Sequence, residues 1–264
     1  MRNYRISNSY SNLLKDFDED EQAIINPFEI ANQVNGFPER LVLTFTRSIV
    51  EKWALMEESK VITHTESANG REPVYVTGYK DRQVAFAMAP VGASACTGIL
   101  EDLIALGARK IVVFGSCGVL DKDIAESRMV IPREAIRDEG TSYHYAPPSD
   151  SIFMDEASVV VLQRVMEDFK YPYVAGKTWT TDAIYRETRK KMMCRKEAGC
   201  IVVEMECAAL IAAARFRAIK FAQFLYAADN LDSEEWEKRG LCVDQGLSNC
   251  EQYMQVALEA VLQL

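Results

Sequence analysis

The chain has 264 residues, 48% hydrophobic and 26% charged, which is the composition of an ordinary globular protein that can bury a core without disulfides. Its 39 acidic and 30 basic side chains give a formal net charge of -9, which argues against a nucleic acid partner. The longest apolar runs fall well short of the roughly 20 residues that span a bilayer, which argues against a membrane protein.

The N-terminal segment is polar and acidic, without the apolar core of a signal peptide, so we expect a cytoplasmic protein. Seven cysteines are an odd number in a chain of this size, and we expect reduced thiols. Two histidines and the absence of a C-x-x-C pair predict no metal site. The sequence predicts an irregular extension over residues 1–35 and one domain over residues 36–264.

Hydrophobic periodicity predicts strands and helices in alternation. The first half is predicted to contain a strand over Arg40–Phe45, a helix over Ser48–Glu58, a hairpin of Val74–Tyr79 and Arg82–Met88, a helix over Ala95–Leu106 and a strand over Lys110–Phe114 that enters a turn at Gly115–Gly118. The second half is predicted to contain strands over Met129–Pro132, Tyr173–Thr180, Ile201–Val203 and Phe221–Ala228, and helices over Ser158–Phe169, Arg186–Ala198, Cys207–Arg217 and Gln245–Leu264. The fold class is therefore α/β, with a central mixed, partly parallel twisted sheet flanked by helices.

Polar residues directly after buried strands are the first candidates for a site, because ligands of α/β sheets collect at the carboxyl ends of strands. The glycine-containing turn at Gly115–Gly118 offers amides and a hydroxyl that suit phosphate, although a tight turn explains it equally well. Glu204 and Glu206 could bind the vicinal hydroxyls of a sugar, or could merely favour a helix N-terminus. Asp229 could be a buried general acid or a cap of the next segment.

Five motifs, in this chain order, resemble the nucleoside phosphorylase family that contains bacterial purine nucleoside phosphorylase and uridine phosphorylase. They are Val91–Ser94, Lys110–Gly118, the Glu139–Pro147 loop with His144, Trp179–Tyr185 and Val203–Leu210. The resemblance covers about residues 40–260, and the ordered set is far more specific than any single motif.

The resemblance implies a role for each motif. Glu206 would bind the ribose hydroxyls, with Glu204 assisting and Met205 packing against the sugar. Tyr185 would stack on the base, and Asp229 would protonate or hydrogen-bond the departing base, as in purine-specific members.

Phosphate would be held by residues from four separate places in the chain: Arg47, Arg71, Ser116 and the backbone around Gly92. Arg71 occupies roughly the place of an arginine that family members lend to the neighbouring subunit. The resemblance therefore implies a homo-oligomer, from dimer to hexamer, with sites shared between subunits.

Several positions depart from the family pattern, mostly on the phosphate side. Val113 replaces the usual arginine two positions before the phosphate-side glycine, and Leu43–Thr46 replaces a glycine-containing first turn. The Gln-x-Arg pair that reads uracil is not found after Tyr185, and Ala228 replaces a small hydroxyl residue. A histidine that the family often supplies from the N-terminus is absent from residues 1–35.

The sequence thus predicts a pentosyltransferase that cleaves a ribonucleoside with inorganic phosphate as co-substrate and no other cofactor. A purine is favoured over uridine because of Asp229. Two alternatives stay open: a nucleosidase of the same fold that uses water, for which Val113 is the best argument, and a nucleoside-binding protein without catalysis.

Overall fold

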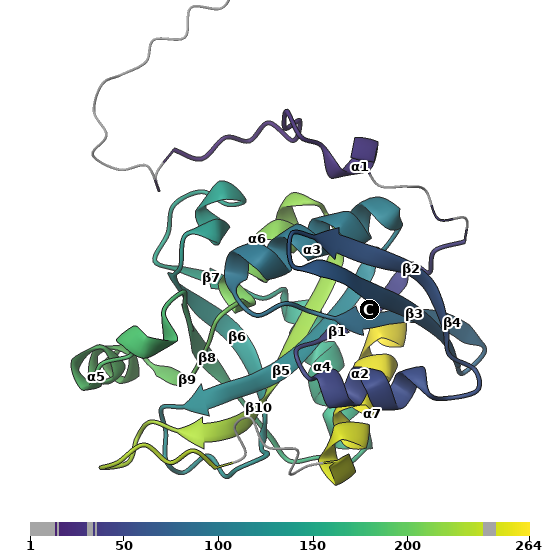
Figure 1. Cartoon of the computed structure of the whole chain (residues 1–264). Coiled ribbons are helices and arrows are strands. Elements are labelled where there is room, and N and C mark those ends of the chain that lie inside the picture. The colour runs from purple at the N-terminus through teal and green to yellow at the C-terminus, as the bar shows by residue number, and fades with distance from the viewer. Residues whose placement is uncertain (1–13, 15, 31–33, 35, 240–246) are drawn as a thin grey trace, which may run out of the picture.

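The computed structural model describes residue 14, residues 16–30, residue 34 and residues 36–239 and 247–264. Within these ranges the chain forms one sheet of ten strands flanked by helices (Figure 1). The strands are β1 (Arg40–Thr44), β2 (Lys60–Ser67), β3 (Gly70–Tyr79), β4 (Arg82–Met88), β5 (Lys110–Val119), β6 (Met129–Asp138), β7 (Ser151–Phe153), β8 (Tyr173–Thr181), β9 (Cys200–Glu204) and β10 (Lys220–Asn230).

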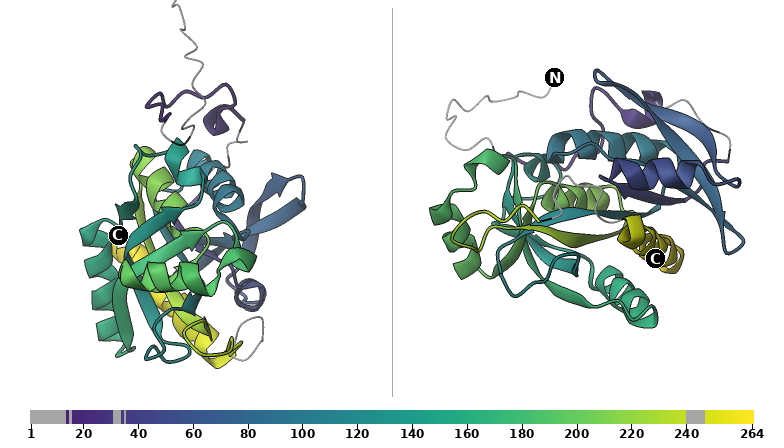
Figure 2. Two further views of the ribbon diagram at one scale, coloured as in Figure 1. Left: turned by 90° about the vertical axis from the view of Figure 1, so that its left-hand side faces the viewer. Right: turned by 60° about the horizontal axis from the view of Figure 1, so that its bottom comes forward.

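The sheet closes on itself around β5. This strand pairs in parallel with β10 and in antiparallel with β9, and the chain of pairs β10–β6, β6–β8 and β8–β9 completes a ring. Beyond the ring, β5 also pairs with β1, and β4, β3 and β2 follow outward. The hairpin strands β2 and β3 therefore lie at the outer edge of the molecule (Figure 2). The predicted mixed sheet of an α/β fold is confirmed.

The helices cover both sides of the sheet. They are α1 (Pro27–Ile30), α2 (Arg47–Ala54), α3 (Ala93–Leu106), α4 (Glu156–Asp168), α5 (Arg189–Glu197), α6 (Cys207–Phe216) and α7 (Leu247–Gln263), with 3-10 turns η2 (Thr141–His144) and η3 (Ile184–Arg186). Helices α3 and α6 pack against each other, while α7 packs against α2 and α4 (Figure 1). No helix in the described part of the chain is long and apolar enough to cross a membrane.

The core explains why these segments fold as they do. Every residue of α6 from Cys207 to Ala214 is buried. Most of these side chains are small, which allows the helix to lie close to the sheet and to α3. Strand β5 is buried along almost its whole length, as expected for a central strand covered on both faces. The edge strand β2 is mostly exposed, and this polar strand was not predicted from the sequence.

The prediction of a turn at Gly115–Gly118 was wrong, because these residues continue β5. Their pairing with β10 runs on through Gly118, which is opposite Asp229. Both glycines are needed for close approach: a Cβ on Gly115 would lie 2.5 Å from the Phe45 ring, and one on Gly118 would lie 2.6 Å from Leu231 Cδ1. The glycines thus make room for side chains across the strand.

Other boundaries differ from the predictions. Strand β6 runs on to Asp138, well beyond the predicted end, because β8 pairs with it over that whole length. The predicted helix over Arg186–Ala198 begins only at Arg189, where the Thr188 hydroxyl accepts a hydrogen bond from the Lys191 N–H. The first two residues of the predicted helix over Gln245–Leu264 lie outside the described residues, as does about half of the predicted N-terminal extension.

Candidate functional site

Glu204, the last residue of β9, has a buried carboxylate that serves the start of α6. Its Oε2 accepts hydrogen bonds from the backbone N–H groups of Glu206 (2.7 Å) and Cys207 (2.6 Å). Its Oε1 accepts from the hydroxyls of Thr180 (2.6 Å) and Thr178 (3.3 Å) on β8. Both oxygens are therefore engaged within the protein, and Glu204 positions the residues that follow it.

Glu206 lies immediately before α6 with a carboxylate that is buried and only partly engaged. Its Oε1 accepts a 2.6 Å hydrogen bond from the backbone N–H of Gly92, which precedes α3. Gly92 has a φ of 101°, a backbone conformation that is unfavourable for residues with a Cβ. Glycine is therefore required at this position to direct the N–H toward Glu206. The structure thus brings together the predicted ribose ligand and the predicted phosphate-side backbone.

Burial and the neighbouring Glu204 carboxylate raise the pKa of Glu206 to about 8, and the hydrogen bond from Gly92 opposes this shift. Burial likewise raises the pKa of Glu204, against the effect of its hydrogen bonds. Two acids so close together in a buried place favour polar donors nearby, such as sugar hydroxyls. Met205 stands between them, half-buried.

Asp229 is near the end of β10, which is separated by β5 from β9, the strand that leads into Glu206. Gly118 of β5 pairs with Val203 of β9 on one side and with Asp229 on the other. Val203 and Asp229 are therefore two strand spacings apart, a distance of about 10 Å. The buried Asp229 carboxylate accepts a 2.8 Å hydrogen bond at Oδ2 from Trp236 Nε1. Burial raises the pKa of Asp229, and the bond from Trp236 lowers it.

Glu187 is a further acid of this region that the sequence analysis missed. Burial, followed by the charge of Asp229, raises the pKa of Glu187 to about 7. The only signal in the sequence was a carboxylate two residues past Tyr185, the last residue of the motif assigned to the base side. Such a signal is weak, because an acid just before a helix is common without any ligand.

Two backbone N–H groups in the turn after β1 donate hydrogen bonds within the protein. The N–H of Phe45 donates to the Phe114 carbonyl at 3.4 Å, and that of Thr46 donates to the Thr44 hydroxyl at 3.2 Å. The Phe45 ring lies over Gly115. Val113, the residue in place of the family arginine, is buried in the hydrophobic core.

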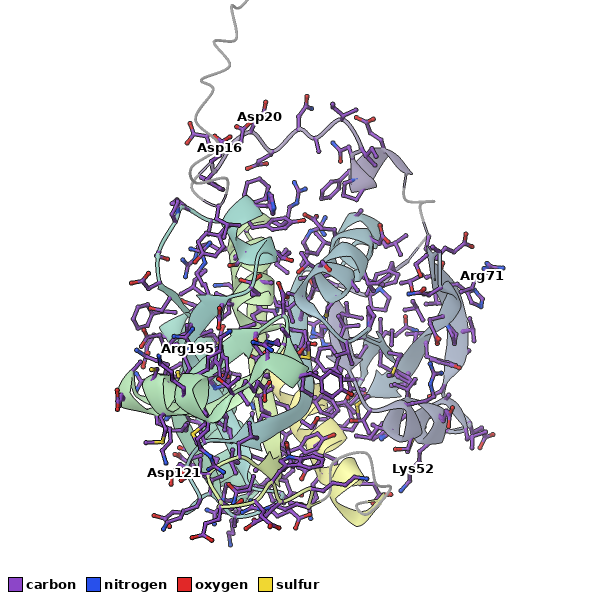
Figure 3. The ribbon with its side chains drawn as sticks, turned by 60° about the vertical axis from the view of Figure 1, so that its left-hand side comes forward. Asp16, Asp20, Lys52, Arg71, Asp121 and Arg195 are labelled. Atoms are coloured by element: carbon purple, nitrogen blue, oxygen red, sulfur yellow. The ribbon has the colours of Figure 1, made fainter. Side chains whose placement is uncertain are left out.

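The two arginines predicted to bind phosphate each form an ion pair at the surface. Arg47 begins α2 and donates to Glu72 at 2.9 Å, with 56% of its side chain exposed. Arg71 is at the start of β3, 2.8 Å from Glu66, and points outward at the edge of the molecule (Figure 3). Ser116 is half-buried on β5 opposite Tyr226, whose hydroxyl is 2.8 Å from the Thr46 hydroxyl.

Tyr185, the predicted base-stacking residue, lies in η3 with 96% of its surface exposed. The loop assigned to binding, Glu139–Pro147, includes η2 and is organised by buried Arg137. This guanidinium donates to the Ser142 hydroxyl and to the carbonyls of Ala146 and Pro147. His144 is exposed. Among the described residues, no three acids, histidines or cysteines are grouped to hold a metal ion.

Comparison with known proteins decides the family. The sequence model of the phosphorylase superfamily matches residues 47–263. The chain belongs to this superfamily. A guanosine phosphorylase of Halorubrum lacusprofundi is 23% identical over 215 residues, covering 80% of this chain and 87% of the relative. The uridine phosphorylase of Treponema pallidum is 29% identical over 181 residues, covering 64% and 68%.

Solved structures share the fold of this phosphorylase superfamily member. Purine nucleoside phosphorylase from Toxoplasma gondii in complex with immucillin-H has a TM-score of 0.75 and 15% identity, covering 92% of this chain and 98% of that one. AMP nucleosidase from Bacteroides thetaiotaomicron has a TM-score of 0.72 and 17% identity, covering 90% and 96%. The family and fold predicted from the sequence are confirmed, and the named relatives are nucleoside phosphorylases, which are pentosyltransferases.

Proposed function

We propose that this member of the phosphorylase superfamily cleaves the N-glycosidic bond of a ribonucleoside with inorganic phosphate, releasing the free base and ribose 1-phosphate. The observation that carries the proposal is that β9, which leads into Glu206, and β10, which contains Asp229, pair with β5 on either side of Gly118. A ribose bound at Glu206 would lie beside a base bound at Asp229. The relatives named guanosine and uridine phosphorylase support the same class of reaction.

In this mechanism Glu206 accepts hydrogen bonds from the ribose hydroxyls, above the half-buried Met205. The bond between the anomeric carbon and the base nitrogen breaks, and the leaving base takes the electron pair. Protonated Asp229 donates to the base, and burial favours this protonated form because it raises the pKa of Asp229. A phosphate oxygen then bonds to the anomeric carbon of the oxocarbenium-like sugar, so the substitution needs no further cofactor.

The phosphate site is part of the proposal and uses Ser116, the Gly92 backbone, Arg47 and Arg71. Arg71 lies on an outward-pointing hairpin, where it could reach the site of a second copy in a homo-oligomer. Arg47 would have to exchange its ion pair with Glu72 for phosphate. Both side chains are exposed, so such rearrangement costs little.

A nucleosidase that uses water is the second candidate, and the phosphate side of the site favours it. Val113 is buried in the core, and the amides of Phe45 and Thr46 are engaged within the protein. A fold relative is named AMP nucleosidase. The burial of Val113 and the engagement of the Phe45 and Thr46 amides each reduce the number of ligands available for an anion.

One assay separates the candidates. The purified protein is incubated with inosine, adenosine, guanosine, uridine or methylthioadenosine, with and without phosphate, and the sugar product is identified. We expect ribose 1-phosphate (or its methylthio counterpart) and a strict dependence on phosphate. Equal turnover without phosphate, giving free ribose, would establish the nucleosidase. Tight binding without any product would instead indicate a binding protein.

Asp229→Asn tests the assigned acid within the same assay. We expect kcat for purine nucleosides to fall by about 10²- to 10⁴-fold, the usual contribution of a general acid. Unchanged purine cleavage would remove Asp229 from the mechanism.

A further inference from the structure

Helix α6 begins beside the carboxylate that is proposed to bind ribose, but this carboxylate does not cap the helix. The first turn of a helix has backbone N–H groups without partners inside the helix, and the side chain of the N-cap residue usually accepts from one of them. The N-cap residue of α6 is Glu206, and its side chain forms no capping hydrogen bond. Its carboxylate instead accepts from the N–H of Gly92, which precedes α3. Other residues therefore have to cap α6.

Thr180 of β8 supplies one of these caps. Its hydroxyl oxygen accepts a 3.0 Å hydrogen bond from the backbone N–H of Ala208, the second residue of α6. Because an N–H group only donates, the single proton of the hydroxyl stays available, and it is donated to Oε1 of Glu204 at 2.6 Å. Glu204 in turn accepts from the N–H of Cys207 at 2.6 Å. Thr180 and Glu204 thus cap α6 together, from two neighbouring strands.

The strand register fixes Thr180 in this place. Thr180 is directly opposite Glu204 in the parallel pairing of β8 with β9, and both residues are buried. The donors to Glu204 are hydroxyls and backbone N–H groups, all of them neutral. Burial raises the pKa of Glu204, and the hydrogen bond from Thr180 is the strongest of the effects that lower it. The Thr180 hydroxyl therefore stabilises the charge of Glu204 as well as the start of the helix.

We propose that Thr180 is a positioning residue for ribose: it caps α6 from outside the helix and so leaves the side chain of Glu206 free for the sugar. The inference rests on the proposed function, in which Glu206 binds the ribose hydroxyls. Without the Thr180 hydroxyl, the N–H of Ala208 loses its acceptor. Glu206, as the N-cap residue, is placed to supply a new one, which would turn its carboxylate away from Gly92 and from the substrate.

The test compares ribonucleosides with their 2′-deoxy counterparts, because only the ribonucleosides present two vicinal hydroxyls to Glu206. We measure kcat/KM with phosphate for guanosine, inosine, adenosine and uridine and for the four deoxynucleosides. In Thr180→Val, which replaces the hydroxyl by a methyl group, the values for the ribonucleosides should fall by about 10- to 100-fold, the effect of losing hydrogen bonds to a charged group. The deoxynucleosides should fall less, so the ratio of ribo- to deoxynucleoside shrinks. Thr180→Ser keeps the hydroxyl and should keep the wild-type ratio.

Thr77→Val is the matched control, because Thr77 is a buried threonine on β3 of the same sheet, outside the site. This variant should retain the wild-type ratio even if it is less stable. Circular dichroism reports the fold of each variant, and Thr180→Ala replaces Thr180→Val if the latter does not fold. A folded variant without the hydroxyl that keeps the wild-type ratio would overturn the proposal. A Thr180→Ser variant that loses the ratio would overturn it as well.

Calorimetric titration in the absence of phosphate provides a readout that does not depend on turnover. The ligands are hypoxanthine and a C-nucleoside analogue of inosine, whose carbon–carbon bond is not cleaved. We expect the wild type to bind the C-nucleoside more tightly than the base, and Thr180→Val to lose this advantage while its affinity for the base is unchanged. That result supports the positioning role even if phosphorolysis fails in the assay above. A wild type that binds both ligands equally, or a Thr180→Val variant that keeps the advantage, would overturn the proposal.

Discussion

The backbone N–H of Gly92 donates a 2.6 Å hydrogen bond to Oε1 of Glu206, which joins the start of α3 to the start of α6. The first group is proposed to bind phosphate and the second to bind ribose. A phosphate oxygen that takes the N–H of Gly92 would release Oε1 for a ribose hydroxyl. In the proposed mechanism the two substrates would therefore compete for the partners of one hydrogen-bonded pair.

This relationship predicts that phosphate and nucleoside bind cooperatively. We expect phosphate to tighten the binding of a non-cleavable nucleoside analogue by about 5-fold or more, within the usual range of coupling between sites. Calorimetric titration of the analogue at several phosphate concentrations measures the coupling, and sulfate serves as a second anion. Equal analogue affinity with and without phosphate would contradict it.

Glu206→Gln should abolish most of the activity while leaving the fold intact. The amide oxygen can still accept from Gly92, but the charged acceptor for the ribose hydroxyls is lost, so we expect kcat/KM to fall by about 10²-fold. Circular dichroism and the melting temperature report the fold. Full activity in a folded variant would mean that ribose is bound elsewhere.

Although Glu206→Gln should lower activity, it should make the folded protein more stable than the wild type at alkaline pH. The pKa of Glu206 is raised from 4.5 to about 8, so between these values the folded protein holds a proton that the unfolded chain has lost. The contribution of Glu206 to stability is therefore complete below pH 4.5 and is lost as the pH rises through about 8. Thermal melts of wild type and Glu206→Gln from pH 5 to pH 9 should diverge, with the variant relatively more stable at pH 9. Parallel curves would show that Glu206 titrates normally.

Trp236→Phe should move the pH profile of the reaction. The bond from Trp236 Nε1 lowers the pKa of Asp229, so its loss should raise that pKa further. If protonated Asp229 is the general acid, the alkaline limb of the kcat/KM profile for guanosine shifts to higher pH. The shift should vanish in a background of Asp229→Asn, whose residual activity is measured in parallel. A shift toward lower pH, or no shift, would show that Trp236 does not lower the pKa of the general acid.

Gly118→Ala tests the close approach between the strands of the site. The new Cβ would lie 2.6 Å from Leu231 Cδ1, 3.1 Å from Val203 Cγ1 and 3.2 Å from Asp229 Oδ1. We expect a loss of about 1–3 kcal/mol of stability and reduced activity, as for other overpacked positions. Gly98→Ala is the control, because its Cβ meets nothing within 4 Å and the residue is in helix α3. That variant should be neutral or about 0.5–1 kcal/mol more stable. Equal melting temperatures for the two variants would contradict the packing argument.

The sequence by itself determined the family, the α/β class and most elements. Nearly continuous apolar runs identify buried strands such as β9 and β10 wherever they lie in the fold, because burial on both faces requires them. It also identified Glu206 and Asp229 as acids that follow or end such strands. These are local properties of the chain.

Only the tertiary structure decided how these residues meet and which groups they engage. Gly115–Gly118 reads as a turn, because the sequence does not reveal that the Phe45 ring and Leu231 occupy the space beside each glycine. Glu187 reads as one more polar residue before a helix, because its partner Asp229 is distant in the sequence. Burial and the proximity of charges depend on contacts between segments far apart in the chain, and these contacts separate an acid that anchors a helix, such as Glu204, from one that faces a substrate.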